Sequence, residues 1–446
     1  MKRFLIGLLA VGLIAAFSVP ALAADVKISG EYWVAGYMES NRAMVSSDER
    51  SQKYYGTFFR MNPVIQVAEG LKLVTRFEGL KRVAGLNAVG SETANGARDV
   101  ANEQSIAMKR AYISAKIPTG ILDVGYMAGG RWGLEAFDYE QDVFRIKYTG
   151  FFGPITILAL TEKGQENSLN AGTTNVVAYS DGTDYNKYAV AGIYKWSGGE
   201  AGYLQYYLVD NRSEGLAANP YKRTFYLGVP YFRATIGAFY VEGEADYYWG
   251  KMYDYVNPGT QNVDFSSISW WLKAKYTMGP AYVGLMAATY AGDDPTTADK
   301  YEGNPTNAAG AGQGYSYDTP VLVLWNDWTS IWSGQPYGTN TASNIGTGGM
   351  PNNVKMYQVF AGFKPMTKLA LDAAFTFMSA DQKPTGYVDD KIGNEFDIKA
   401  AYKLYDNLEY MIAFGYLWTG DYFKGAATTN TVGDDWLLMH KLTLTF

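Results

Sequence analysis

Apolar and polar residues alternate along most of the chain. Segments 71–78, 395–403 and 408–418 each carry aliphatic or aromatic residues at every second position, separated mostly by charged or small residues. Successive side chains of a β-strand point to opposite faces, so this period predicts strands with one apolar face. No convincing helical pattern follows residue 24 outside the long connections. The chain is therefore expected to be all-β.

The connections between these segments are short and long in turn. Short ones include 118–120, 229–231 and 278–280, whereas 243–262 and 292–352 are long and mostly polar. About nine long and eight short connections predict about 18 strands, with about 16 as the alternative. We expect a transmembrane antiparallel up-and-down β-barrel with short periplasmic turns and long extracellular loops, because this rhythm is typical of such barrels.

The first 23 residues have the pattern of a secretory signal peptide. Lys2 and Arg3 precede an apolar run at 4–17, and the A-x-A cleavage pattern follows at 21–23. The apolar run is short for a membrane-spanning helix. We therefore expect residues 1–23 to be a signal peptide and residues 24–446 to form an outer-membrane β-barrel, exported through the periplasm of a Gram-negative cell.

The composition suits a membrane interface. Tyr occurs 37 times and Trp 11 times, and both prefer positions with one apolar and one wet end. Eight residues rise roughly 26 Å along a strand, near the height between the aromatic rims of a barrel. Pairs at this spacing that we assign to the two rims are Tyr188 and Trp196, Phe232 and Tyr240, Tyr282 and Tyr290, and Tyr410 and Trp418.

The last strand carries a resemblance to a known family. Leu442, Leu444 and Phe446 share one face, with Lys441 and Thr443 on the other. This resembles the closing strand of Gram-negative outer-membrane proteins, and the whole arrangement resembles the general diffusion porins, to which the hairpin at 108–133 is also similar. The resemblance implies passive diffusion of small hydrophilic solutes, a barrel-assembly signal at Phe446, contact with outer-membrane lipid and lipopolysaccharide, and often a homotrimer.

Placing Phe446 toward lipid allows inward positions to be assigned strand by strand. At these positions basic residues outnumber acidic ones more than twofold, although the whole chain has a net charge of −6. A narrow passage lined by cations favours anions. Alternatively the cations are paired with carboxylates, or are screened at the periplasmic rim. The residues assigned to the pore lining are Arg60, Arg76, Arg110, Arg145, Lys147, Lys187, Lys273, Lys399 and Lys441.

The longest connection, 292–352, contains an apolar cluster at 319–332. An exposed cluster of this kind would favour aggregation, so we expect it to fold into the barrel mouth or to pack on a neighbouring subunit. One hypothesis is a constriction, a second is aromatic stacking against a sugar, and a third is a packed plug without solute contact. The residues assigned to the constriction loop are Trp325, Asp327, Trp328 and Trp332.

The sequence offers few residues for catalysis or for metal binding. The chain has no Cys and one His, and we expect no enzymatic activity, no cofactor, no metal and no nucleic-acid partner. The acidic run at 293–302 could bind Ca²⁺ but is more typical of a solvated loop. His440 is assigned to the lipid face. The alternatives are a structural or adhesin-type outer-membrane barrel, a barrel sheath for a partner protein, and a barrel enzyme such as a lipase or protease.

Overall fold

The computed structural model describes residues 25–40, 44, 51–84, 106–134, 137, 141–166, 184–215, 219–305, 321–324 and 351–446. The first nine strands of these residues are β1 (Asp25–Ser40), β2 (Gln52–Ala68), β3 (Leu71–Val83), β4 (Ala107–Ile117), β5 (Gly120–Gly129), β6 (Gln141–Phe152), β7 (Ile155–Gln165), β8 (Tyr185–Trp196) and β9 (Gly199–Asp210).

The second part of the chain continues the same pattern. Its elements are β10 (Tyr221–Ile236), β11 (Phe239–Tyr255), β12 (Val263–Met278), β13 (Ala281–Tyr290), β14 (Lys300–Tyr301), β15 (Val354–Met366), β16 (Leu369–Ala380), β17 (Lys391–Tyr405), β18 (Leu408–Thr419) and β19 (Asp435–Thr445), with 3-10 helices η3 (Arg212–Gly215) and η4 (Asp421–Lys424). Within the described ranges, no helix combines the length and the hydrophobicity of a membrane span.

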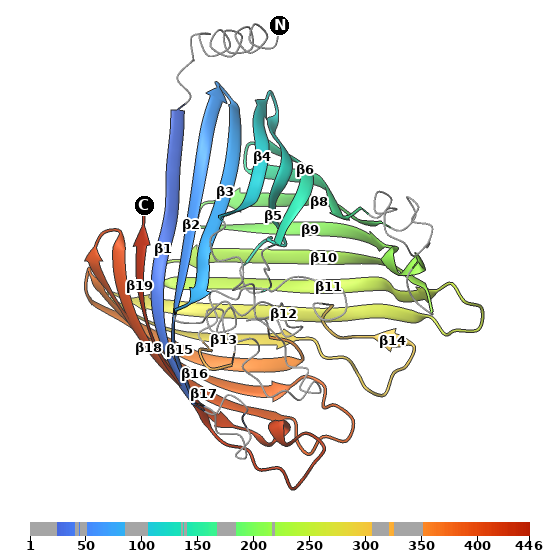
Figure 1. Cartoon of the computed structure of the whole chain (residues 1–446), viewed down its shortest axis with the longest axis vertical. Coiled ribbons are helices and arrows are strands. Elements are labelled where there is room, and N and C mark those ends of the chain that lie inside the picture. The colour runs from blue at the N-terminus through green and yellow to red at the C-terminus, as the bar shows by residue number, and fades with distance from the viewer. Residues whose placement is uncertain are drawn as a thin grey trace, which may run out of the picture.

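The strands form one closed antiparallel barrel (Figure 1). β1 pairs with β2 on one side and with β19 on the other, which closes the ring. β14 is a two-residue segment that pairs in parallel with the end of β12, so the wall itself has 18 strands in the described residues. The predicted fold class and strand number are confirmed. Closure pairs the backbone amides of every strand and leaves no edge facing lipid.

Tight turns and long connections lie at opposite ends of the barrel, which we call the turn end and the loop end. The eight two-residue turns are at 69–70, 118–119, 153–154, 197–198, 237–238, 279–280, 367–368 and 406–407. Each antiparallel hairpin returns the chain to the loop end, so both termini of the wall lie at the turn end.

One predicted hairpin is wrong. β10 runs without interruption through 229–231, and its turn lies at 237–238. The misleading residue is Pro230, because proline lacks a backbone N–H and usually marks the end or edge of a strand. Here the pairing of β10 with β11 passes from Gly228 to Tyr231 without a partner for Pro230, whereas β9 still pairs with it through Tyr203. The predicted long loop at 243–262 is correspondingly shortened to 256–262, because β11 extends to Tyr255.

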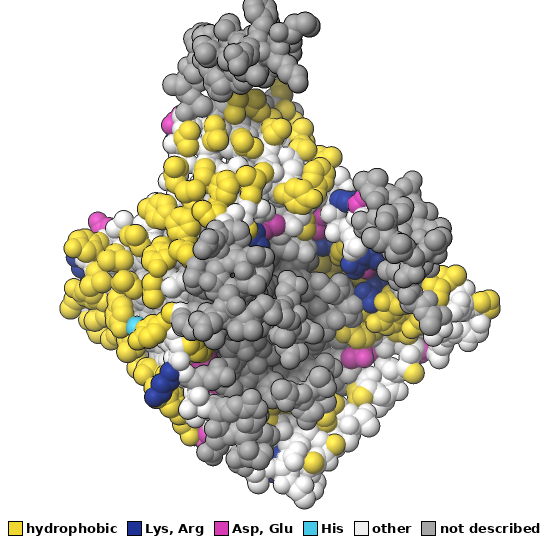
Figure 2. All heavy atoms as spheres, viewed as in Figure 1, with side chains coloured by type: hydrophobic (Ala, Val, Ile, Leu, Met, Phe, Trp, Pro, Cys, Tyr) yellow, Lys and Arg dark blue, Asp and Glu magenta, His cyan; other side chains and the backbone are white. Residues whose placement is uncertain are grey.

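Many large apolar side chains are exposed on the outer face of the wall, and Figure 2 shows apolar side chains gathered over the upper and left parts of the view. On β19, Leu438, Leu442 and Leu444 are exposed on this face, whereas Leu437 and Met439 are buried on the inner face. The alternation predicted from the terminal residue is therefore present in this strand. Exposed aliphatic side chains on a closed barrel are those that contact lipid.

Aromatic side chains mark the rims, but only two of the four assigned pairs do so. Tyr188 and Trp196 are exposed on the outer face, and so are Tyr410 and Trp418. The assignment of the other two pairs is wrong. Phe232 and Tyr240 lie on either side of the 237–238 turn, and Tyr282 and Tyr290 share the inner face of β13 with buried Met286. A row of outer-face rings crosses β8 to β11 in direct register, formed by Tyr188, Tyr207, Tyr226 and Trp249.

The inner face holds a large apolar cluster. It joins buried side chains of many strands, among them Trp33 on β1, Tyr290 on β13 and Met356 on β15, to buried side chains of several connections, including Leu134 and Val321. Barrels of 16–18 strands usually enclose a water-filled channel, so an apolar cluster inside this barrel departs from the usual arrangement. The apolar cluster therefore confines any aqueous passage to part of the cross-section.

Candidate functional site

The candidate site is the interior of the barrel, where arginines of neighbouring strands form a row. Arg60 on β2, Arg76 on β3 and Arg110 on β4 are close enough to interact electrostatically. Arg76 and Arg110 are direct cross-strand partners, and Arg76 Nε also donates to Asn62 Oδ1 at 2.9 Å. Like charges placed directly opposite one another destabilise a sheet. This arrangement therefore points to a role other than stability.

Two arginines of this row are held by carboxylates. Arg60 contacts Glu31 at 3.1 Å and Glu78 at 2.8 Å, so it bridges β1 and β3. Arg110 contacts Asp142 at 2.6 Å, near the start of β6. These carboxylates fix the guanidinium groups in position and offset part of their charge.

A second group lies further round the wall. Glu162 on β7 is fully buried and accepts from Arg145 and Lys187, each at 2.7 Å. Arg145 also donates to the Tyr206 hydroxyl at 3.0 Å. Two cations share one carboxylate, so this cluster keeps a positive charge. Lys147 lies on the same strand as Arg145 and pairs with Asp123 at 3.1 Å.

The remaining residues assigned to the pore lining are spread over other strands. Lys273 approaches Glu242 at 3.5 Å, Lys399 approaches Asp372 at 3.3 Å, and Lys441 lies 5.0 Å above the ring of Trp33. They are not brought together with the arginine row in the described structure, since they belong to β12, β17 and β19.

Several inward carboxylates were missed by the sequence analysis. Glu162, Glu200, Glu242 and Glu244 all lie on the inner face and are buried or nearly so. Glu244 was missed because the misplaced turn at 229–231 put it inside the predicted loop at 243–262, and Glu242 was missed because it stood at the very end of the predicted strand. The expected basic excess of the wall is therefore too large, and the alternative of cations paired with carboxylates describes most of the residues named above.

The connection between β5 and β6 enters the barrel. Leu134 is buried, and its backbone N–H donates to Glu244 Oε2 on β11 at 2.5 Å. Trp132 donates from its ring nitrogen to the carbonyl of Val229 at 3.1 Å. Phe137 contacts the ring of Tyr290 at 5.1 Å between centroids. The described residues of this connection thus reach from β5 to β10, β11 and β13 and occupy part of the barrel interior.

Gly133 allows this crossing. Its φ of +70° is one that glycine adopts readily, and a Cβ added there would lie 2.2 Å from Glu244 Oε2. None of the residues of this connection was assigned to the interior from the sequence. The signal that was available is the set of apolar residues within it, namely Trp132, Leu134 and Phe137.

A second inward segment, 321–324, belongs to the longest connection. Val321, Val323 and Leu324 are buried in the apolar cluster. Glu395 on β17 accepts from the backbone N–H groups of Val323 at 2.6 Å and Leu324 at 3.3 Å. The expectation that this cluster folds inward is confirmed for these four residues.

Asp397 on β17 completes the attachment of that segment. Its Oδ1 accepts from the backbone N–H of Leu322 at 3.3 Å, and its side chain is buried. Buried backbone amides need partners, and here two adjacent inward carboxyl groups supply them. Trp325, Asp327, Trp328 and Trp332, assigned to the constriction, lie outside the described residues, so their role stays a prediction.

The two residues singled out near the chain end lie on the wall. Phe446 exchanges backbone hydrogen bonds with Gly30 at 2.8 and 3.1 Å, and its ring stacks on Phe59 at 6.4 Å. It therefore lies at the seam where the barrel closes. The His440 ring lies 5.9 Å from the rings of both Tyr55 and Tyr410, which are exposed on the outer face.

Comparison with known proteins supports the architecture. No family model and no curated protein matches the chain. Among solved structures, it is similar to OccK2 (OpdF) of Pseudomonas aeruginosa, with TM-score 0.53 and 11% identity over 95% of this chain and 98% of that one. It is also similar to OccK8 (OprE) of the same organism, with TM-score 0.52 and 11% identity over 94% and 98%.

A third solved structure is a BenF-like porin of Pseudomonas fluorescens, with TM-score 0.51 and 12% identity over 94% of this chain and 99% of that one. At this level of identity the likeness concerns the fold, and it extends over nearly the full length of each chain. The chain has the closed antiparallel β-barrel fold that these outer-membrane porins also have.

Proposed function

We propose that the protein is an outer-membrane channel for passive diffusion of small hydrophilic solutes, with a preference for anions. The observation that carries the anion preference is the pairing of Arg76 with Arg110 in register on the inner face. Cations held close together in a narrow, low-dielectric passage raise the local concentration of anions. The cluster in which Arg145 and Lys187 share one carboxylate adds to the same field.

The preference should be modest rather than strict. Arg60 and Arg110 each have carboxylate partners, and a paired cation contributes less to the field along the passage than a lone one. We expect the reversal potential in a salt gradient to lie between zero and the value for an ideally anion-selective pore. A value on the cation side would contradict the proposal.

A second candidate is a plugged barrel with a structural, adhesin-type or sheath role. It is favoured by the two inward segments, residues 132–134 with Phe137 and residues 321–324, and by the apolar cluster around them. Swelling of liposomes in small neutral sugars separates the candidates, because an open channel admits the sugars and a plugged barrel does not. Absence of swelling would favour the second candidate.

We further propose how the protein reaches the membrane and assembles there. Residues 1–23 would be removed as a signal peptide, and Phe446 would be read by the barrel-assembly machinery. The turn end would then face the periplasm and the loop end the exterior. Contact with lipopolysaccharide and assembly into a homotrimer remain part of the same proposal, and chemical cross-linking in isolated outer membranes tests the second of these.

A further inference from the structure

Charged side chains form an alternating lattice near the turn end of β8 to β12. In register across the sheet lie Lys195 opposite Glu200, then Glu200 opposite Arg233, then Arg233 opposite Glu242, and finally Glu242 opposite Lys273. Opposite charges placed across strands support one another. The cross-strand ion pairs of this lattice therefore help to hold β8 to β12 in register.

The two signs are not equally exposed. The side chains of Lys195 and Arg233 are 60% and 49% exposed, whereas those of Glu200 and Glu242 are only 12% and 11% exposed; Lys273, at the far end of the lattice, is 16% exposed. Arg233 contacts Glu200 at 2.7 Å, and the Tyr231 hydroxyl also donates to Glu200 at 3.2 Å. The carboxylates therefore lie beneath the cations, and the surface offered to water is positive.

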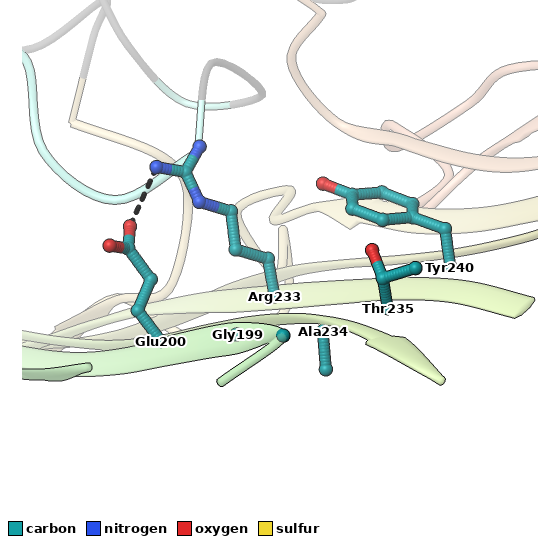
Figure 3. Close-up of a pocket in the computed structure, with 7 residues that line it drawn as sticks. Gly199, Glu200, Arg233, Ala234, Thr235 and Tyr240 are labelled. Atoms are coloured by element: carbon teal, nitrogen blue, oxygen red, sulfur yellow. Dashed lines mark ion pairs between the residues drawn. The ribbon is translucent and has the colours of Figure 1, made fainter. Parts of the chain in front are cut away.

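A hollow of about 380 Å³ lies over this lattice, lined by Glu200, Arg233, Thr235 and Tyr240 together with the glycines of the 197–198 turn region. Figure 3 shows Arg233, Thr235 and Tyr240 projecting to one side of the sheet and Ala234 to the other. Arg233 shares its face with buried Tyr231, so this side is the interior of the barrel.

Further groups at the hollow suit an anion. The ammonium of Lys275 lies 5.3 Å above the ring of Tyr240. The Tyr240 hydroxyl donates to Glu242 Oε2 at 2.6 Å, which holds the ring in place. A guanidinium group presents paired N–H donors that match the oxygens of a carboxylate or phosphate. The hollow is therefore lined by the guanidinium of Arg233, which Glu200 holds in place, and by the ring of Tyr240, which lies beneath the ammonium of Lys275. Its volume is in the range that a small solute occupies.

We propose that this hollow is a binding site for a small oxyanion, either a carboxylate or a phosphate solute, at the turn end of the passage. The proposal rests on the channel function proposed above, since the site is reached from the aqueous interior. A bound anion would bridge Arg233 and Lys195 from the water side without displacing Glu200. The site would then be the last position that an entering anion occupies before it leaves the barrel.

A cysteine placed at the hollow provides a local readout, because the chain has no Cys of its own. Thr235→Cys is reacted with a negatively charged and a positively charged methanethiosulfonate reagent of similar size. Ser114→Cys is the matched control, because it lies on β4, at a similar height near the turn end but away from the hollow. Millimolar gluconate, inorganic phosphate or neutral sorbitol is then added as competitor.

We expect the negative reagent to react several-fold faster than the positive one at Thr235→Cys, and with a smaller ratio at the control. Gluconate should slow the reaction if the site takes carboxylates, and phosphate should slow it if the site takes phosphates, while sorbitol should not. Adding Arg233→Gln should abolish both the preference and the protection, whereas Arg233→Lys should retain part of each.

Two results would contradict the site proposal. If neither anion protects Thr235→Cys, or if protection survives Arg233→Gln, the site proposal is wrong. Heat-modifiable migration in gels verifies folding, and Lys195→Gln replaces Arg233→Gln if the latter does not fold. Reversal potentials of the unmodified protein separate the two proposals. If the channel is anion-selective but neither anion slows the labelling of Thr235→Cys, only the binding site is rejected. If an anion slows the labelling but the channel is cation-selective, only the anion preference is rejected.

Discussion

The backbone N–H of Val323 donates to Oε1 of Glu395 at 2.6 Å, although the two residues are 72 positions apart in the chain. The bond attaches part of the longest connection to the inner face of β17. A similar attachment joins Leu134 to Glu244 on β11. In both places a buried carboxyl group binds the backbone of an inward segment, so the width of the passage depends on side chains of the wall.

Replacing Glu395 should loosen the 321–324 segment. Glu395→Ala leaves two buried N–H groups, those of Val323 and Leu324, without their acceptor, and each unsatisfied buried group costs about 1–3 kcal/mol. We expect lower stability toward guanidinium and a larger or noisier single-channel conductance. Asp406→Asn, in an exposed turn at 406–407, is the control. Conductance equal to that of the control would show that this segment does not narrow the passage.

Replacing Arg76 should change the ion selectivity of the channel with little change in the stability of the protein. Arg76→Gln removes the repulsion with Arg110 across the strands, which is worth roughly 0.2–1 kcal/mol, and also the hydrogen bond from Arg76 to Asn62, so the net change in stability should be small. The same change removes a cation from the passage, so the reversal potential should shift toward that of potassium. Denaturant titration and bilayer recording measure the two effects.

Arg60→Gln is the comparison for that variant. Arg60 contacts both Glu31 and Glu78, and its loss leaves two carboxylates without this partner. Stability should therefore fall while the reversal potential again shifts toward that of potassium. If Arg76→Gln lowers stability as much as Arg60→Gln does, the repulsion between Arg76 and Arg110 is not a net cost in the folded protein.

Gly133→Ala should displace the connection between β5 and β6. The added Cβ would meet Glu244 Oε2 at 2.2 Å, and the φ of +70° disfavours alanine. Gly237→Ala is a matched control, because its φ of +62° is similar but nothing lies within 4 Å of the added atom. We expect both variants to lose about 1 kcal/mol from backbone strain, and only Gly133→Ala to change the conductance. An equal conductance in both would contradict the assigned role of this connection.

Phe446→Ala should lower the amount of folded protein in the outer membrane. The ring stacks on Phe59 at the closing seam, and the proposed assembly signal would also be lost. Phe446→Tyr keeps an aromatic ring and should retain most of the folded protein. Heat-modifiable migration of membrane fractions measures the folded share. Equal amounts for all three proteins would argue against a role for this ring in assembly.

The sequence predicted the architecture well because a barrel repeats one local rule. Alternating apolar positions and tight turns recur in every hairpin, so the strand number follows from the rhythm even with one hairpin misplaced. Pro230 caused that error, because a proline inside a wall strand contradicts the usual positional preference. The consequence was that Glu244 was not recognised on the inner face.

The candidate site was less predictable because it depends on contacts between distant segments. Alternation indicates that Arg145 and Lys187 point inward, but it does not reveal that Glu162 lies between them. The apolar cluster at 319–332 drew attention to one inward segment. The same argument applied to Trp132, Leu134 and Phe137 would have found the other.

Recording single channels of the refolded protein in a planar bilayer with a potassium chloride gradient tests the central claim most directly. A water-filled passage lined by the arginine row should give discrete conductance steps and a reversal potential displaced toward that of chloride. The absence of steps, or a displacement toward the potential of potassium, would contradict it.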